Sequence, residues 1–303
     1  MTIRRKPTPP AADSLCGDMN HRASFLALAA GFSALVSPLS AHEEPFGYLR
    51  GAQSEPKGEW EVNQWTTARF GKESGRYLGM DFATELEYGI TDRFQAALYL
   101  TGNYHRIQNS AGSSDTFDDR NRFGLSGTSL EMKYQLADPY RQWAGFALYF
   151  EPGYSTIDAV SGERNQEVEL ELRLIGEKHF LDHRLIAVVN YILEPEFEHE
   201  PGQAWETNLA MEWSAGLSWK LSEHWRIGAE CRLRTKFEDA DLNDAEHLTF
   251  YAGPTLHYSN ERFFATLTVL PQLRGWPNNR GTAGLHLDES EKLELRLKLG
   301  TEF

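Results

Sequence analysis

The sequence lacks the features that mark several common classes of protein. It has only two cysteines, Cys16 and Cys231, and no Cys spacing typical of a zinc site. Because Cys16 lies in a segment that we expect to be removed, no disulfide can form within the mature chain. The low mean hydropathy argues against membrane-spanning helices, each of which needs about 20 consecutive apolar residues. It does not argue against a transmembrane β-barrel, whose strands are apolar on one side only.

Basic residues are also scarce. The 303 residues include 30 Lys and Arg against 44 Asp and Glu, which gives a formal net charge of −14. Phosphate binding requires clustered Lys and Arg side chains. The charge balance therefore predicts no nucleic-acid partner.

The N-terminus has the pattern of a secretory signal peptide. Residues 25–36 form a short apolar core, which follows His21 and Arg22 and precedes a stretch of small residues ending at Ala41. The core is too short for a retained membrane anchor. We therefore predict a signal peptide over residues 1–41.

The start of translation and the domain boundaries follow from this assignment. Met19 is an alternative start that would give the signal peptide a more usual charged region. Residues 42–58 are predicted to form a periplasmic N-terminal segment, and residues 59–303 a transmembrane barrel.

From Trp60 onward, apolar and polar residues alternate in segments joined by alternately short and long connections. This alternation gives a strand one apolar face and one polar face. The first segment, at about 59–70, is the least regular. The predicted strands cover about 59–70, 78–90, 94–104, 130–136, 144–154, 168–174, 185–197, 209–219, 225–237, 248–258, 263–273 and 293–303.

The number and connection of these strands predict the fold. Twelve is an even number, and short turns alternating with longer loops are typical of outer-membrane barrels. Aromatic residues stand near both ends of the apolar faces, as a membrane with two interfaces favours. We predict an all-β, transmembrane, antiparallel up-and-down β-barrel of about 12 strands. A soluble barrel or sandwich with its apolar face inward is the alternative.

The last strand carries a further signal. Leu293, Leu295, Leu297 and Leu299 occupy alternate positions, and Phe303 follows in the same phase. The pattern resembles the C-terminal signal of bacterial outer-membrane barrels, which the barrel-assembly machinery reads. We expect this strand to pair with the first, outer-membrane lipids and that machinery to be partners, and both termini to be periplasmic.

The polar faces of the strands would line a lumen. Strand 225–237 is a ladder of positive charge, whereas strands 78–90 and 168–174 are acidic, and walls of unlike sign orient polar solutes. The sequence thus predicts a passive channel or selective pore for a small polar solute of unknown identity. In the alternative, the charges pair across neighbouring strands and close the bore. The lumen-lining candidates are Asp81, Glu85, Glu87, Glu131, Lys133, Glu169, Glu171, Arg173, Glu212, Arg226, Glu230, Arg232 and Arg234.

Two other functions are compatible with the same barrel. His257 and Ser259 resemble the His-x-Ser-Asn element of outer-membrane phospholipase A and the lipid A deacylase, in which His activates Ser for acyl transfer. Strand 248–258, however, runs toward the periplasm and places this element away from the outer leaflet. The third possibility is a closed structural or surface-binding barrel that acts through its loops at 107–122 and 274–290.

One acidic run in the sequence is a candidate metal site. Glu194, Glu196 and Glu198, followed by His199, offer hard ligands for a divalent cation. Such a run is more often the solvated end of a strand. We expect no metal, no cofactor and no catalytic residue.

Three stretches carry a family resemblance. They are Glu44-Pro-Phe-Gly-Tyr48, the stretch from Pro56 to Trp65, and Glu85-Leu-Glu-Tyr-Gly-Ile-Thr-Asp-Arg93. Together they resemble a family of uncharacterised bacterial outer-membrane β-barrel proteins, porin-like in type, over most of the mature length. The resemblance implies the fold and an outer-membrane location, and it assigns no functional residue.

Overall fold

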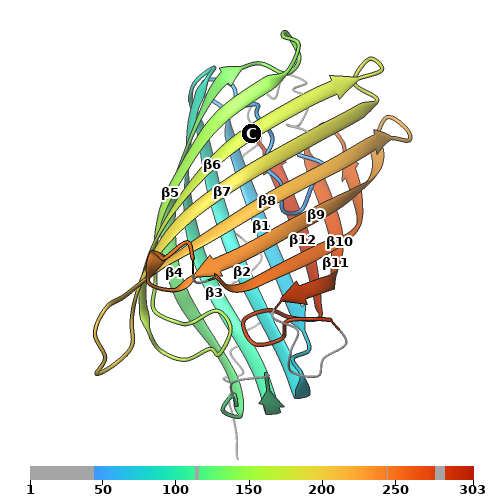
Figure 1. Cartoon of the computed structure of the whole chain (residues 1–303). Helices are drawn as coiled ribbons and strands as arrows, with labels where there is room; N and C mark the ends of the chain where they lie inside the picture. The colour runs from blue at the N-terminus through green and yellow to red at the C-terminus, as the bar shows by residue number, and fades with distance from the viewer. Residues whose placement is uncertain (1–43, 113–115, 244, 277–283) are drawn as a thin grey trace, which may run out of the picture. The chain divides into compact units, whose positions relative to one another are not determined.

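The computed structural model describes residues 44–112, 116–243, 245–276 and 284–303, which form a closed antiparallel barrel (Figure 1). The predicted signal peptide, residues 1–41, lies outside the described residues. None of the helices in the described parts of the chain is long and apolar enough to cross a membrane. The strands are β1 (Trp60–Phe70), β2 (Ser74–Thr91), β3 (Phe94–Ala111), β4 (Arg120–Ala137), β5 (Gly145–Ser155), β6 (Gln166–Phe180), β7 (Leu185–His199), β8 (Glu206–Lys220), β9 (Trp225–Phe237), β10 (Ala245–Ser259), β11 (Phe263–Trp276) and β12 (Leu293–Glu302), with a short 3-10 helix, η1 (Glu238–Ala240).

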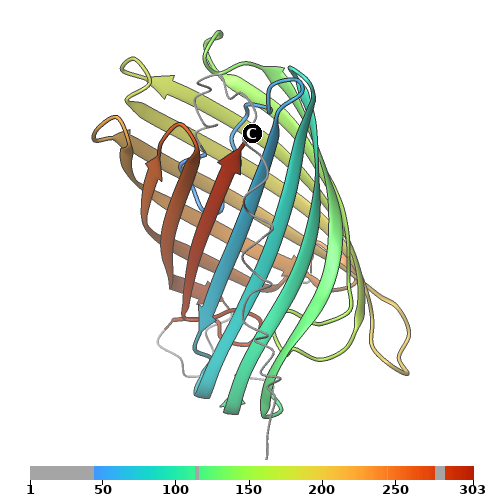
Figure 2. The same ribbon diagram turned by 180° about the vertical axis from the view of Figure 1, so that it is seen from behind.

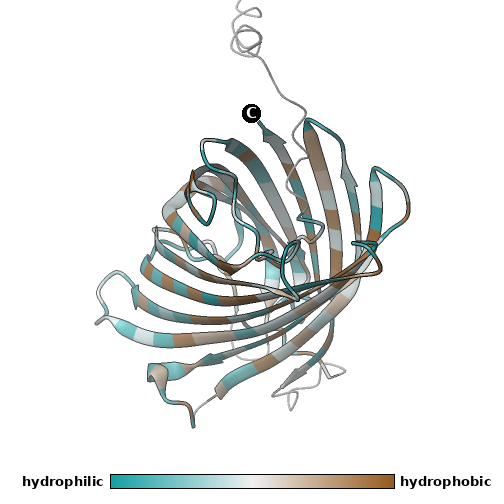
Figure 3. Cartoon of the chain, turned by 90° about the horizontal axis from the view of Figure 1, so that it is seen from above, coloured by the Kyte–Doolittle hydropathy of each residue, from teal (hydrophilic) through white to brown (hydrophobic). Residues whose placement is uncertain are grey.

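The alternation in the sequence places apolar side chains outside the barrel. On β3, Leu98 and Leu100 are each 56% exposed, whereas Ala97 and Tyr99, which alternate with them, are buried. Figure 3 shows the resulting bands of hydrophilic and hydrophobic residues along the strands. A soluble barrel would turn the apolar phase inward. An outward apolar face with a polar interior is the arrangement of a transmembrane barrel.

The first and last strands close the barrel. β1 pairs with β12 on one side and with β2 on the other, as the sequence predicted. The main chains of Trp60 and Phe303 exchange hydrogen bonds of 3.1 and 2.9 Å. The irregular pattern of β1 has a local cause, because the large apolar side chain of Trp65 lies on the inward face, where it contacts Arg50.

The barrel has two different ends. The short-turn end holds connections 92–93, 138–144, 181–184, 221–224 and 260–262, and the long-loop end holds the others. The predicted polar loop 107–122 is shorter than expected, because β3 continues to Ala111 and β4 begins at Arg120. Pairs such as His105 with Arg122 continue the ladder. Beyond the apolar band both faces of a strand can be polar, so the pairing continues after the alternation has ended.

The stretch before β1 is the main departure from the predicted organisation. The sequence assigned residues 42–58 to a segment ahead of the barrel, but the structure places residues 44–55 within the lumen (Figures 1 and 2). We call these residues the N-terminal segment. Phe46 and Leu49 pack against Ile186 and Val188 of β7. These inward apolar residues offer the segment an apolar surface inside an otherwise polar lumen.

Candidate functional site

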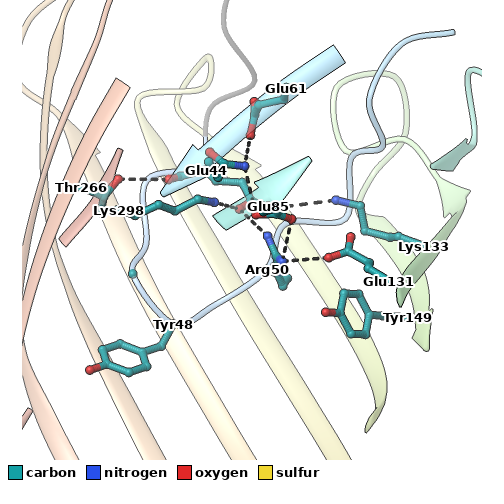
Figure 4. Close-up of polar contacts among 12 residues, drawn as sticks. Glu44, Tyr48, Arg50, Glu61, Glu85, Glu131, Lys133, Tyr149, Thr266 and Lys298 are labelled. Atoms are coloured by element: carbon teal, nitrogen blue, oxygen red, sulfur yellow. Dashed lines mark hydrogen bonds and ion pairs between the residues drawn. The ribbon is translucent and has the colours of Figure 1, made fainter. Parts of the chain in front are cut away.

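Arg50 is the central charge of the N-terminal segment. Its guanidinium lies 2.8 Å from Glu131, 3.1 Å from Glu85 and 3.4 Å from Glu44 (Figure 4). The hydroxyl of Tyr99 contacts the same guanidinium. These groups are buried, and ionised groups in a buried site stabilise it only when each has partners of opposite charge. Arg50 therefore joins the segment to β2 and β4 of the barrel wall.

The backbone of the segment is held by side chains of four strands. The N–H groups of residues 47 and 48 donate to the two carboxylate oxygens of Glu230, at 2.8 and 2.9 Å. Those of residues 50, 52 and 55 donate to Asn190, Glu177 and Gln95, at 2.8, 2.7 and 2.8 Å. A buried extended segment needs such partners for its N–H groups. The acceptors here are side chains of the barrel wall, whereas in a sheet they would be main-chain carbonyl groups of a neighbouring strand.

The start of the segment lies against β11 and β12. The carboxylate of Glu44 pairs with Lys298 and lies 3.9 Å from the ammonium of Lys133. Its carbonyl oxygen accepts a hydrogen bond of 3.4 Å from Thr266 (Figure 4). The segment thus crosses from β11 and β12 to β2 and β4 and spans the lumen.

Tyr48 lies between two arginines. The guanidinium carbons of Arg296 and Arg232 stand 3.9 and 4.3 Å from the centre of its ring, where cation–π attraction operates. Burial, with the carboxylate of Glu294, raises the pKa of Tyr48 well above its ordinary value. The phenol is therefore neutral and serves as a contact surface for the two cations.

Beyond Tyr48 and Arg50 the lumen widens into a cavity of about 440 Å³, which we call the chamber. Ten carboxylates and six cationic side chains line it. The carboxylates come mainly from β5 to β8, and most of the cations from β9 and β12. The acidic residues are Glu151, Asp158, Glu167, Glu169, Glu171, Glu194, Glu196, Glu198, Glu212 and Glu289, and the basic residues are Arg50, Arg173, Arg232, Arg234, Lys236 and Arg296.

Part of this charge is paired between side chains of neighbouring or nearby strands. Arg232 contacts Glu212 and Glu294, each at 2.7 Å. Lys236 lies 3.2 Å from Glu196 and 3.1 Å from Glu198. These pairs neutralise part of the charge where the acidic and basic walls meet. Over the whole lining, carboxylates remain in excess.

Two connections of the long-loop end also line the chamber. The hydroxyl of Tyr77 donates to the carbonyl oxygen of Val160, between β5 and β6, at 2.7 Å. That of Tyr251 donates to the carbonyl oxygen of Glu291, between β11 and β12, at 2.8 Å. The chamber is thus bounded by the N-terminal segment on one side and by these connections on the other.

Comparison with known proteins supports this architecture. A family model matches residues 38–303. The chain belongs to the Family of unknown function (DUF6662). A search of the curated proteins finds no match for this DUF6662 protein.

Solved structures share the fold of the DUF6662 barrel. The crystal structure of the COG4313 outer membrane channel from Pseudomonas putida F1 matches with a TM-score of 0.55 and 13% identity, over 83% of this chain and 98% of that one. The KdgM porin matches with a TM-score of 0.46 and 11% identity, over 80% and 99%. LpxR from Salmonella typhimurium matches with a TM-score of 0.43 and 10% identity, over 81% and 99%. At 13% identity, the match to the Pseudomonas channel establishes the fold of an outer-membrane barrel.

The candidate residues of the DUF6662 protein differ in the contacts they make. Glu85, Glu131 and Glu230 hold the N-terminal segment, and Arg226 donates to Ser218 at 3.1 Å near the short-turn end. The candidates that line the chamber are Glu169, Glu171, Arg173, Glu212, Arg232 and Arg234. By exposure, Glu85, Glu87, Glu131, Lys133, Arg173, Glu212, Arg226 and Glu230 are buried, and Asp81, Glu169, Glu171, Arg232 and Arg234 are half-buried.

Sequence reasoning missed the residues that form the lumen contacts of the segment. Glu44, Tyr48 and Arg50 precede the strands and show no periodicity. The sequence of β7 did contain an indication of the segment. Ile186 and Val188 point into the lumen and are apolar, although the outward face of the same strand is apolar as well. A strand that is apolar on both faces needs a covering on its inner face as well.

His257 and Ser259 do not form a nucleophile and base pair. They are two positions apart on β10, and a catalytic His must bring a ring nitrogen to within about 3 Å of its Ser hydroxyl. His257 is fully buried and contacts Thr266 at 2.8 Å. Within the described chain no hydrogen bond joins His257 to Ser259.

The acidic run at the end of β7 faces a cation of the protein itself. Lys236 pairs with Glu196 and Glu198, as described above. The ring of His199 lies against that of Trp205, with centroids 5.1 Å apart and planes tilted by 34°. The carboxylates of this run therefore serve as part of the acidic chamber wall.

Proposed function

We propose that this DUF6662 barrel is an outer-membrane channel, passive or selective, for small polar solutes, and that its N-terminal segment closes it. The observation that carries the proposal is the chamber, a charged cavity bounded by a segment whose main-chain N–H groups, over the described residues 44–55, donate to side chains of the wall. The name of the Pseudomonas protein, an outer membrane channel, supports the same function for a barrel of this fold. The charged lining favours polar solutes over apolar ones.

The form of the attachment favours a removable closure over a permanent filling. Small closed barrels fill their interior with side chains of their own strands, which cannot leave the lumen. Here the bonds of residues 44–55 to the wall run to side chains such as Glu230 and Asn190, and water can replace each of them. Gly58 follows the segment with a φ of 91°, and nothing lies within 4 Å of the place where a Cβ would stand. It is a suitable pivot for movement of the segment.

The location of the protein follows from the same proposal. The exposed apolar band contacts outer-membrane lipids, and the last strand is the element that the barrel-assembly machinery recognises. Both termini and the short-turn end are periplasmic, because short turns face the periplasm in barrels of this type. The N-terminal segment would then close the channel from the periplasmic side.

Single-channel recording tests the proposal. Residues 42–303 and a variant that lacks residues 44–55 are refolded, checked for heat-modifiable migration, and inserted into planar bilayers. We expect brief openings from the complete chain and a steady open level from the deletion variant. A folded deletion variant that passes no current would remove the channel function and leave a closed structural or surface-binding barrel.

A further inference from the structure

Two histidines meet at the short-turn end, outside the apolar band. His179 is the second-last residue of β6, and His183 lies in the turn before β7. Their Nδ1 atoms are 2.7 Å apart. Two imidazole nitrogens at this distance share one hydrogen bond or converge on a common ligand.

The turn between them has an uncommon backbone. Leu181, Asp182 and His183 all have positive φ, of 54°, 52° and 64°. Residues other than glycine adopt this region at a cost, and consecutive examples are associated with functional sites. This turn places the ring of His183 edge-on to that of His179, with centroids 5.0 Å apart.

A carboxylate fixes the orientation of His179. Its Nε2 lies 2.5 Å from one oxygen of Glu177, and both side chains are almost completely buried, at 4% and 6% exposed. The other oxygen of Glu177 accepts the N–H of Ala52 at 2.7 Å. With the proton of His179 held on Nε2, the lone pair of Nδ1 points toward His183. Metal-binding histidines commonly donate their second nitrogen to a carboxylate in this way.

Tyr140 covers the pair. Its ring stacks on His183, with centroids 5.0 Å apart and planes at 28°, and meets His179 edge-on at 4.5 Å. Tyr140 thus covers the two rings from one side, and His183 is exposed to solvent on the opposite side. Water has access to the convergent nitrogens from that side.

From this geometry we propose that His179 and His183 bind a first-row transition metal ion of the Zn²⁺, Ni²⁺ or Cu²⁺ class. Imidazole pairs select these ions over Ca²⁺ or Mg²⁺, which take oxygen ligands. Metal–nitrogen bonds of about 2.0–2.1 Å at a tetrahedral angle place two nitrogens about 3.3 Å apart. A small rotation of the exposed His183 provides this opening. Water completes the coordination.

Glu177 is a positioning residue of this site. It holds His179 through one oxygen and the N-terminal segment through the other, so the metal site and the segment share one carboxylate. Metal binding itself does not depend on conduction, and it is measured separately from any current. Failure of the site leaves the proposed channel function untouched.

The test is a Cu²⁺ titration of the refolded barrel, residues 44–303, which carries no polyhistidine tag and no N-terminal histidine. Electron paramagnetic resonance counts the coordinating nitrogens, and competition with a chelator gives the affinity. We expect one site with two nitrogens, weakened at least tenfold in His183→Ala and about 10- to 100-fold in Glu177→Gln. At saturating Cu²⁺, Glu177→Gln should still show two coordinating nitrogens, because both histidines remain. If the substitution instead disrupted the structure of the site, one nitrogen would be lost from the spectrum.

His199→Ala is the matched control, because this histidine lies at the other end of the barrel beside Trp205. Its removal should leave Cu²⁺ affinity unchanged. His183 is exposed in a turn, so its variant is expected to fold, and heat-modifiable migration verifies this. The absence of binding in the unchanged chain, or equal binding in His183→Ala, would overturn the proposal.

Discussion

Arg50 Nη2 lies 2.8 Å from Glu131 Oε2, and this ion pair joins the N-terminal segment to the barrel wall at β4. The same guanidinium contacts Glu85 on β2. One side chain of the segment therefore neutralises two buried carboxylates from different strands. Closure of the lumen and stability of the wall are coupled at this point.

Replacement of Arg50 by Ala is expected to release the segment. Removing one partner from a buried ion pair costs about 3–5 kcal/mol, because Glu85 and Glu131 are left without the cation. A change of this size corresponds to a shift of 100-fold or more between closed and open states. Single-channel recording should show that rise in open probability. Arg141→Ala, at an 87% exposed position in connection 138–144, is the control and should leave the records unchanged.

The charge of the chamber predicts its ion preference. With ten carboxylates against six cationic side chains in the lining, the open channel should prefer cations. Reversal potentials in a salt gradient measure this preference on the Arg50→Ala background. Glu171→Gln should weaken the preference for cations and Arg234→Gln should strengthen it. Equal reversal potentials in both variants would show that solutes bypass the chamber.

Glu289 predicts a pH dependence at the long-loop end. Burial, followed by the carboxylate of Glu246, raises its pKa from about 4.5 to about 7. The folded state therefore keeps a proton that the unfolded state loses above pH 4.5. This contribution to stability is complete below that pH and falls as the pH rises through 7, by up to about 3 kcal/mol. The other charged groups facing Glu289 are Lys236, Lys72 and Asp158.

Hydrogen exchange of residues 284–292 measures this effect. After correction for intrinsic rates, protection should be greater at pH 5.5 than at pH 8.5. In Glu289→Gln, which cannot ionise, the difference should disappear. An unchanged pH dependence in that variant would assign the effect to another group.

The strands could be predicted because each one repeats a two-residue pattern that burial imposes. Leu98 and Leu100 face outward and Ala97 and Tyr99 inward, and a shift of one residue would reverse every side chain. The inward charges could be assigned in the same way. Their partners could not, because ion pairs such as Arg232 with Glu294 depend on the order of strands around the closed barrel.

The N-terminal segment could not be predicted from its own residues. It has no strand ladder, and its contacts with Glu230 and Asn190 lie more than 130 residues away in the chain. Only the wall carried a sign of it, in the inward apolar residues of β7. The pairing of His179 with His183 was likewise hidden, because it depends on three successive positive φ values that residue types do not predict.

Ser259→Ala is expected to leave the lipids of the outer membrane unchanged. Ser259 and His257 lie two positions apart on one strand, and His257 is buried inside the barrel against Thr266. A lipid ester would have to pass the wall to reach either residue. Mass spectrometry of phospholipids and lipid A, with and without expression of the protein, measures the outcome. A hydrolysed product that disappears in Ser259→Ala would establish the hydrolase instead.

Phe303 is expected to matter more for assembly than for stability. Its main chain exchanges hydrogen bonds with Trp60, and Phe303→Ala preserves both of them while removing a side chain that is 57% exposed on the outer surface. Folded stability should therefore fall by no more than about 1 kcal/mol, as measured by urea unfolding in detergent. In cells the yield of heat-modifiable barrel should fall much further, because we propose that the assembly machinery reads the last strand. Phe263→Ala, an outward aromatic on the neighbouring strand opposite Thr301, is the control. Equal losses in both variants would indicate that Phe303 acts only as a membrane-facing aromatic residue.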